Sequence, residues 1–238
     1  MCKKRQSKEA SKVILKAGDY KIKPSENEKL LGAIIDGTGG WKEMLRDGKE
    51  SVLKQVTTRL NGLKKIAVNA DFKTRLMVAT GIIQSKLQYL MPLYIGAPDY
   101  LINVLQVQQL NAARTVCGYK SYYWSTSKLL NACGWLSIKQ QMFASTVSMA
   151  HNIVQTGVPR NIHASLVKEY PYRTRQATKG DIRSIVNPVN QISSSITKTF
   201  KNQARIWYNQ IPVTIRQLQK KRFKQELKIW VKENVQIR

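Results

Sequence analysis

The chain has 238 residues, of which 42% are hydrophobic, so it is long enough to bury a core. Its formal net charge is +26, from 40 lysines and arginines against 14 aspartates and glutamates, and this excess indicates a polyanionic partner. No segment approaches the ~20 apolar residues of a membrane span, and the three widely spaced cysteines form neither a disulfide framework nor a zinc pattern.

The N-terminal part predicts a small β element. The opening, MCKKRQSKEASK, lacks the apolar centre of a signal peptide, so we expect an intracellular protein, in the nucleus or the cytoplasm and not secreted. Residues 13–23 fit two short strands around Ala-Gly-Asp, and residues 30–35 a third, buried strand. The glycines of GTGGW have neither the spacing nor the hydroxyl of a phosphate-binding loop. They are interpreted as a flexible turn between a strand and a helix.

Three helices are predicted next, over 52–67, 72–90 and 98–118. Apolar residues step by three and four along the first two, and Pro98 opens the third. Asp71 is expected to cap the second helix, and Gly118 to end the third. We expect the first two apolar stripes to pack together: Val52, Val56, Leu60 and Leu63 from one helix, and Phe72, Leu76, Ala79 and Ile83 from the other.

The rest of the chain is also predicted to be helical. A short helix is expected around 127–132, a longer one over 137–157 with a serine cap, and two more around 200–209 and 219–234. Between them, residues 170–195 show no period and predict a mobile basic loop. Trp207 and Trp230 lie on apolar stripes and are interpreted as core residues.

Several segments, taken in chain order, carry a resemblance to a known family. They are KLLGAIIDGTGGW from Lys29, LNGLKKI, DFKTRLMVATGIIQSKLQYLMPLYIG, LQVQQLNAARTVCGY, STSKLLNACGWLSIKQQM, FKNQARIWYNQIPVTIRQ and KRFKQELKIWV. In this order they resemble the region that follows the polymerase palm in reverse transcriptases of non-LTR retrotransposons, of the LINE type and jockey-like. Where that family usually has Trp-Asn-x-Leu-Pro, this chain has WYNQIP from Trp207.

The resemblance implies a mainly α fold in three regions. Residues 1–43 would be a β remnant of the palm with a primer-grip-like segment, 44–119 a thumb-like helical region, and 120–238 a basic helical C-terminal region with the mobile loop at about 170–195. By the same resemblance, the residues beside the primer strand would be Leu31, Gly32 and Asp36.

The catalytic motif of that family is missing from the chain. Its polymerase activity needs Tyr/Phe-x-Asp-Asp and an upstream aspartate, which hold two Mg²⁺ ions in the full-length enzymes. No two aspartates are adjacent in this sequence, and its two histidines suggest neither a metal site nor a catalytic triad. By the comparison, Met1 falls just after the catalytic strands. We therefore expect no catalytic residue, no metal ligand and no cofactor in this chain, and no polymerisation by it alone.

Binding of RNA or an RNA–DNA hybrid is the function that charge and resemblance both predict, with the missing N-terminal polymerase portion as a further partner and no membrane. Lysines and arginines would contact phosphates without reading bases, and tyrosines beside Lys120 would suit stacking on unpaired bases. The candidate residues are Lys54, Arg59, Lys64, Lys65 and Arg75; Lys120, Tyr122 and Tyr123; Arg173, Arg175, Lys179 and Arg183; and Lys220, Lys221, Arg222 and Lys224.

Other interpretations stay open from the sequence. A basic chain also suits a membrane surface or an acidic protein, and each charged residue taken singly fits a solvated face. Packing explains the tyrosines as well as stacking does. The alternative to a polymerase fragment is a stand-alone or domesticated basic helical protein that binds nucleic acid or acts as a scaffold.

Overall fold

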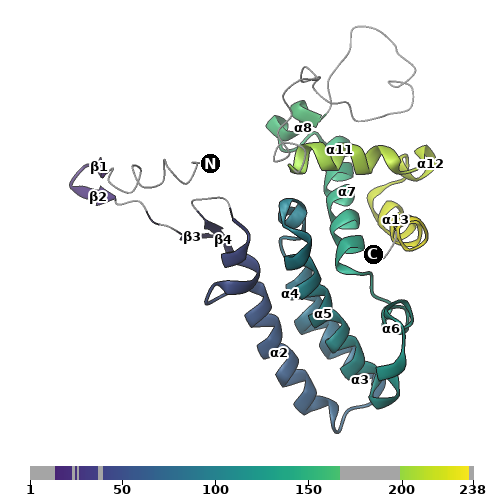
Figure 1. Ribbon diagram of the computed structural model, residues 1–238. Coiled ribbons are helices and arrows are strands. Elements are labelled where there is room, and N and C mark those ends of the chain that lie inside the picture. Colours follow the sequence, from purple (N-terminus) through teal and green to yellow (C-terminus); the bar gives the residue numbers. More distant parts are fainter. Residues whose placement is uncertain (1–13, 23–24, 26, 37–39, 167–198, 236–238) are drawn as a thin grey trace. The chain divides into compact units, whose positions relative to one another are not determined.

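The computed structural model is mainly helical, as the sequence predicts (Figure 1). It describes residues 14–22, 25, 27–36, 40–166 and 199–235, so the predicted loop at 170–195 lies outside the described residues. The chain divides into two compact units: unit 1 is Met1–Leu87 with Ala97–Tyr123, and unit 2 is Gln88–Gly96 with Trp124–Arg238. In the described part of the chain, no helix combines the length and apolarity needed to cross a bilayer.

Unit 1 begins with two β-hairpins. Strand β1 (Leu15–Ala17) pairs antiparallel with β2 (Tyr20–Ile22), which confirms the two short strands predicted around Ala-Gly-Asp. Strand β3 (Asn27–Leu30) pairs with β4 (Ala33–Asp36) in the same way, and Leu30 stands opposite Ala33.

The single buried strand predicted over residues 30–35 is wrong. Leu31 and Gly32 form a two-residue turn between β3 and β4, with φ values of 48° and 80°. A hairpin turn of this kind needs positive φ at both central positions, which glycine adopts freely and leucine rarely. Leu30 and Leu31 are 59% and 83% exposed. The apolar run LLGAII is therefore the tip of a hairpin, in which Ala33 is buried and both leucines are exposed.

Two helices of unit 1 begin at side-chain caps, and a glycine follows a third. In chain order they are η1 (Glu43–Asp47), α2 (Val52–Ala67), α3 (Phe72–Ala79), η2 (Thr80–Gln84), α4 (Ser85–Gln88), α5 (Asp99–Cys117) and η4 (Tyr119–Tyr123). Asp71 accepts a hydrogen bond from the Thr74 amide at 3.1 Å, which confirms the predicted cap of α3. Gly118 follows α5, as predicted, and Ser51 caps α2.

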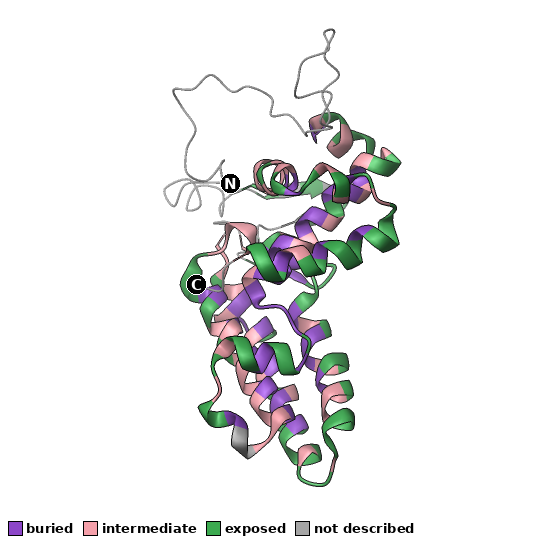
Figure 2. Ribbon diagram, turned by 90° about the vertical axis from the view of Figure 1, so that its right-hand side faces the viewer, coloured by how far each residue is buried: buried purple, intermediate pink, exposed green. Residues whose placement is uncertain are grey.

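Helices α2, α3 and α5 pack against one another and enclose an aliphatic core. Each long helix has a buried face and an exposed face (Figure 2). The stripe predicted on α2 is buried as expected, from Val52 to Leu63. On the second helix, Ala79 and Ile83 are buried, but Phe72 is 43% exposed because it occupies the first turn, directly after the cap. The π-helical turn η2 then adds one residue to the helical repeat and brings Gln84 inside beside Ile83.

Unit 2 is built around α7 (Ile138–Thr156), which packs against η3, α8, α11 and α13. Its other elements are η3 (Met91–Gly96), α6 (Thr126–Ala132), α8 (Arg160–Leu166), α11 (Phe200–Gln210), α12 (Val213–Arg216) and α13 (Lys220–Asn234). The helices predicted around 127–132, 137–157, 200–209 and 219–234 are confirmed, and η3, α8 and α12 were not predicted. Ser137 and Gln140 form a capping box at the start of α7.

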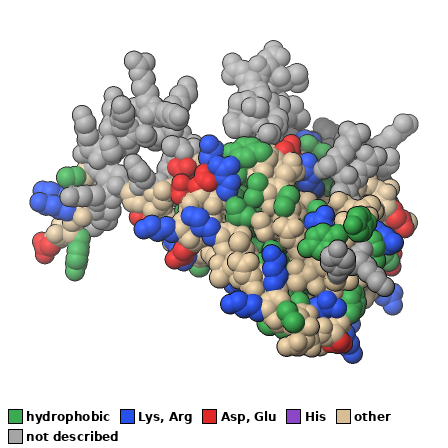
Figure 3. Space-filling model, turned by 60° about the horizontal axis from the view of Figure 1, so that its bottom comes forward, with side chains coloured by type: hydrophobic (Ala, Val, Ile, Leu, Met, Phe, Trp, Pro, Cys, Tyr) green, Lys and Arg blue, Asp and Glu red, His purple; other side chains and the backbone are tan. Residues whose placement is uncertain are grey.

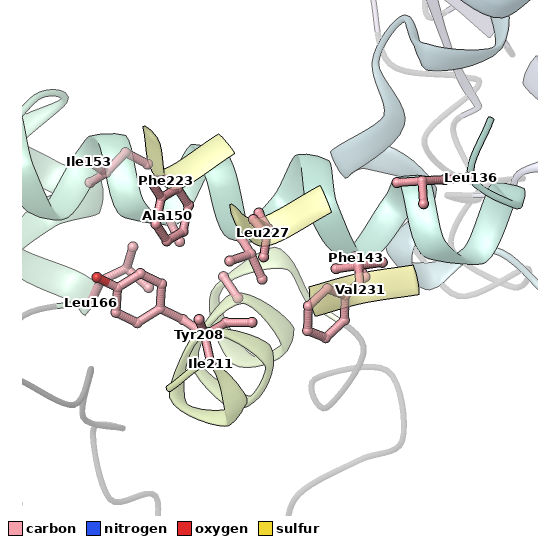
Figure 4. Close-up of a cluster of buried hydrophobic side chains, with 12 residues drawn as sticks. Leu136, Phe143, Ala150, Ile153, Leu166, Tyr208, Ile211, Phe223, Leu227 and Val231 are labelled. Atoms are coloured by element: carbon pink, nitrogen blue, oxygen red, sulfur yellow. The ribbon is translucent and has the colours of Figure 1, made fainter. Parts of the chain in front are cut away.

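Aromatic side chains from α7, α11 and α13 meet in the core of unit 2 (Figure 4). Trp207 and Trp230, which the sequence places in the core, are half-buried and pack against it. Their rings lie 5.2 Å and 5.8 Å from that of Phe143, measured between ring centroids. The ring of Phe223 stacks on His151 with centroids 3.7 Å apart.

Two buried polar side chains join the helices of unit 2. Gln140 donates from Nε2 to the carbonyl oxygen of Val235 at 2.8 Å, so the start of α7 is tied to the residue after α13. In His151, Nε2 lies 3.1 Å from the carbonyl oxygen of Leu218, and Nδ1 lies 3.3 Å from the hydroxyl of Tyr208. A neutral ring with its proton on Nε2 donates to the carbonyl and accepts from the hydroxyl, which satisfies both nitrogens.

Candidate nucleic-acid interface

Two of the cations predicted to contact nucleic acid also have structural partners. Lys54 donates from Nζ to the carbonyl oxygen of Asp47 at 2.8 Å, and Arg59 donates from Nη1 to that of Ile82 at 2.7 Å. Ile82 lies in the π-helical turn, where the regular helical hydrogen-bond pattern is interrupted. Arg59 is half-buried and Lys54 exposed. These two side chains stabilise the packing around α2, whatever else they contact.

Lys64 and Lys65 occupy the last turn of α2 and are both exposed. The carbonyl groups at the end of a helix attract cations, so this position suits two lysines without any ligand. Lys64 also lines an open hollow of about 640 Å³ on unit 1, together with Asn111, Arg114, Thr115, Gly118 and Tyr122.

The hollow gathers positive charge from three helices. Lys64 comes from α2 and Arg114 from α5, and both line it. Arg75, from α3, lies behind the lining: its Nη1 donates to the carbonyl oxygen of Thr115 at 3.4 Å. Its Nε is buried and has no hydrogen-bond partner among the described residues. Cations from distant parts of the sequence therefore meet at one end of α5.

Gly118 shapes the corner where α5 passes into η4. Its φ of +80° and ψ of −174° are available to glycine and strained for other residues. Ser121, fully buried, donates from Oγ to the carbonyl oxygen of Gly118 at 2.6 Å and lies 3.3 Å from that of Arg114. This buried serine fixes the backbone next to Tyr122, whose side chain is 65% exposed and lines the hollow.

The other predicted aromatic contacts differ in exposure. Tyr123 is 91% exposed and does not line the hollow. In unit 2, Lys128 lies over the half-buried ring of Trp124, with Nζ 4.6 Å from the centroid. The backbone of Lys120 belongs to η4, but its side chain lies outside the described residues.

The primer-grip-like residues lie on the β3–β4 hairpin. Leu31 and Gly32 are its exposed turn, and Asp36 is half-buried at the end of β4. On β3, Lys29 forms an ion pair with Glu50 and lowers the pKa of that carboxyl through this hydrogen bond. The hairpin thus presents an apolar turn and a lysine that is already partnered.

A second basic surface lies at the start of α13. Lys220, Lys221, Arg222 and Lys224 are all exposed, while Phe223, Leu227 and Val231 face the core from the same helix. The amide groups at a helix start repel cations, the first turn has no acidic residue, and Gln219 makes no side-chain cap. Three cations in a first turn reduce the stability of the helix, and a bound anion would relieve them. Arg173, Arg175, Lys179 and Arg183 lie outside the described residues.

Basic side chains are spread over the face shown in Figure 3, with fewer acidic ones between them.

Lys86 has a lowered pKa, chiefly through burial and then through the nearby charges of Arg59 and Lys29. In the described part of the chain, no group of three or more histidine, cysteine, aspartate or glutamate side chains is placed to hold a metal ion. The arrangement suits contact with phosphates.

Sequence reasoning missed three residues of the hollow, Asn111, Arg114 and Thr115. Their spacing of three and four residues places them on one face of α5, and this spacing was the available signal. It did not show that Lys64 and Arg75 would lie beside them.

No family model, curated protein or solved structure matches this chain. The resemblance to non-LTR reverse transcriptases therefore stays a prediction.

Proposed function

We propose that this chain binds RNA or RNA–DNA hybrids without catalysing a reaction, as the C-terminal helical portion of a non-LTR retrotransposon reverse transcriptase. The observation that carries the proposal is the convergence of Lys64, Arg75 and Arg114 at one hollow beside an exposed tyrosine. The order of the family-like segments supports the polymerase assignment. The absence of adjacent aspartates supports the lack of catalysis.

Charge supports binding that is mainly electrostatic and weakly selective for sequence. A protein that neutralises phosphates releases counterions, so log affinity falls linearly with log salt. The slope is about 0.9 per phosphate for duplex DNA and about 0.7 for a single strand. A non-specific complex of this kind has a dissociation constant of about 10⁻⁴ to 10⁻⁶ M at physiological salt.

The experiment measures fluorescence anisotropy of a labelled RNA–DNA hybrid across a series of salt concentrations. Changing Lys64→Gln and Lys65→Gln together is expected to flatten the salt slope by about one to two units and to weaken all sequences alike. With Mg²⁺ and deoxynucleotides added, the same complexes are expected not to extend the primer.

A matched control is the pair Lys16→Gln and Lys21→Gln on the β1–β2 hairpin, which removes the same charge from exposed positions. It is expected to leave the slope unchanged. Affinity that barely responds to salt, an equal effect in the control, or template-dependent extension would each contradict the proposal.

A further inference from the structure

Resting on the proposed function, we propose that the hollow of unit 1 receives one unpaired nucleotide of a nucleic acid strand, with its phosphate at Lys64 and Arg114 and its base on the ring of Tyr122. The volume of about 640 Å³ lies within the range of about 300–1,000 Å³ that is usual for small-ligand sites. A nucleotide fits such a space.

The phosphate side of the hollow is partly preorganised. Arg114 Nη1 lies 3.4 Å from Asn111 Oδ1, one turn earlier on α5, so the guanidinium is oriented before any ligand arrives. Lys64 adds a compact charge on a flexible stem at the end of α2. Behind them, Arg75 brings a third charge next to Thr115 and has a buried Nε without a partner among the described residues.

The base side is the ring of Tyr122. An aromatic ring that is 65% exposed at the edge of a basic hollow offers a stacking face, and every base has a matching π-face. The backbone that presents the ring is held by Ser121, whose hydroxyl is buried against the carbonyl groups of Gly118 and Arg114. The stacking surface is therefore built into the corner after α5.

Such a site distinguishes unpaired from paired strands. In a duplex each base is stacked between its neighbours, so only phosphates reach Lys64 and Arg114, and the tyrosine contributes nothing. At a single-stranded tail the base is free to turn onto the ring. The tyrosine should therefore add affinity only where an unpaired nucleotide is present.

The test compares the full chain on a blunt RNA–DNA hybrid and on one with an RNA tail of about four unpaired nucleotides, which is the lower end of the site sizes of single-strand-binding OB folds and exceeds the one nucleotide that the hollow receives. The wild type is expected to bind the tailed hybrid about tenfold more tightly. Tyr122→Ala should remove that advantage, so that the variant binds the tailed and the blunt hybrid with equal affinity. Tyr122→Phe, which keeps the ring, and Tyr123→Ala, which changes the adjacent exposed tyrosine outside the hollow, should both retain it.

A 2-aminopurine in the tail gives a second readout. Its fluorescence should be quenched on binding the wild type and Tyr122→Phe, and not on binding Tyr122→Ala. The inference would be overturned if Tyr122→Ala still bound the tailed hybrid more tightly than the blunt one, or if Tyr123→Ala lost this preference to the same extent. In either case, salt-dependent binding of the blunt hybrid would still support the proposed function. If free adenosine monophosphate displaces the tail at micromolar concentration, the hollow is a site for small nucleotides, and the inference is also wrong. No binding of either hybrid would contradict the proposed function itself.

Discussion

The two units differ in their buried titratable groups and in where their surface cations lie along a helix. In unit 1, none of the buried side chains among the described residues titrates, and Lys64 and Lys65 stand where a helix end attracts cations. In unit 2, the core holds Tyr94, His151 and Tyr208, and the cations of α13 stand where a helix start repels them.

This difference predicts that the core of unit 2 makes its stability depend on pH near neutrality, whereas the pH dependence of unit 1 arises from surface carboxylates at more acidic pH. Burial lowers the pKa of His151 and raises those of Tyr94 and Tyr208, so each of these groups prefers its neutral form inside the core. The basic start of α13 is expected to decrease stability in the absence of an anion.

The largest effect is expected from Leu60→Asp in unit 1. Leu60 lies in the buried seam of α2, so the change removes apolar contacts and places an unpaired charge in the core. The free energy of unfolding should fall by at least about 4 kcal/mol at any pH where the aspartate is ionised. Chemical denaturation followed by circular dichroism measures it.

Asn61→Asp provides the matched control for Leu60→Asp. It adds the same charge at the next residue of α2, which is exposed. This variant should stay within about 0.5 kcal/mol of the wild type. A Leu60→Asp protein as stable as the control would show that Leu60 does not face the core of unit 1.

A smaller effect is expected from pH, and in unit 2 first. Because the folded pKa of His151 is lowered from 6.5, the unfolded chain binds the extra proton more readily. The contribution of His151 to the free energy of unfolding is complete above pH 6.5 and is lost as pH falls, by up to about 1.4 kcal/mol per pH unit. In unit 1, Asp47 and Glu50 have lowered pKa values, so their contributions are lost only at more acidic pH.

Tryptophan fluorescence separates these events, because Trp41 is the only tryptophan of unit 1 and the other four belong to unit 2. Urea unfolding between pH 7 and about pH 5 should show the loss in the wild type and in His163→Gln. His151→Gln should be nearly flat over the same range. A flat wild-type profile would mean that the ring of His151 is not confined to its neutral form.

The smallest effect compares the two basic helix ends directly. Changing Lys220, Lys221 and Arg222 together to glutamine should raise the free energy of unfolding by about 0.5–1 kcal/mol at low salt, because it relieves repulsion at the start of α13. The Lys64→Gln, Lys65→Gln variant should instead lose a similar amount. Both should weaken hybrid binding. If both variants changed the free energy of unfolding in the same direction, the start of α13 and the end of α2 would not differ in how they tolerate cations.

Local patterns explain what could be predicted from the sequence. The caps at Asp71 and Ser137 and the helix end at Gly118 depend on residues within a turn of one another, so they were correct. The stripe of α2 was also correct, because a regular period of three and four needs no tertiary information. The single strand predicted over residues 30–35 was wrong because the length of the apolar run matched a strand. The glycine within the run, Gly32, was the signal for a turn.

Tertiary placement explains what could not be predicted. The π-helical turn brings Gln84 inside beside Ile83, which a periodic pattern does not reveal. The hollow joins Lys64, Arg75 and Arg114 through packing of α2 and α3 on α5, and no short-range rule links residues so far apart. The partners of His151, Tyr208 and Leu218, lie more than fifty residues further along the chain, so its burial with both ring nitrogens engaged follows from packing alone.

The bond from Gln140 to Val235 has a consequence for the order in which the chain folds during synthesis. Its two ends are 95 residues apart, and the aromatic core of unit 2 likewise waits for Phe223, Leu227 and Val231. At about 5–20 residues per second, a ribosome needs several seconds to make that interval. The α2–α5 core of unit 1 is complete in sequence by then, so unit 1 should fold while α7 still lacks α11 and α13. During that interval the part of α7 that packs against these two helices is exposed, and it is the surface on which a chaperone is expected to act.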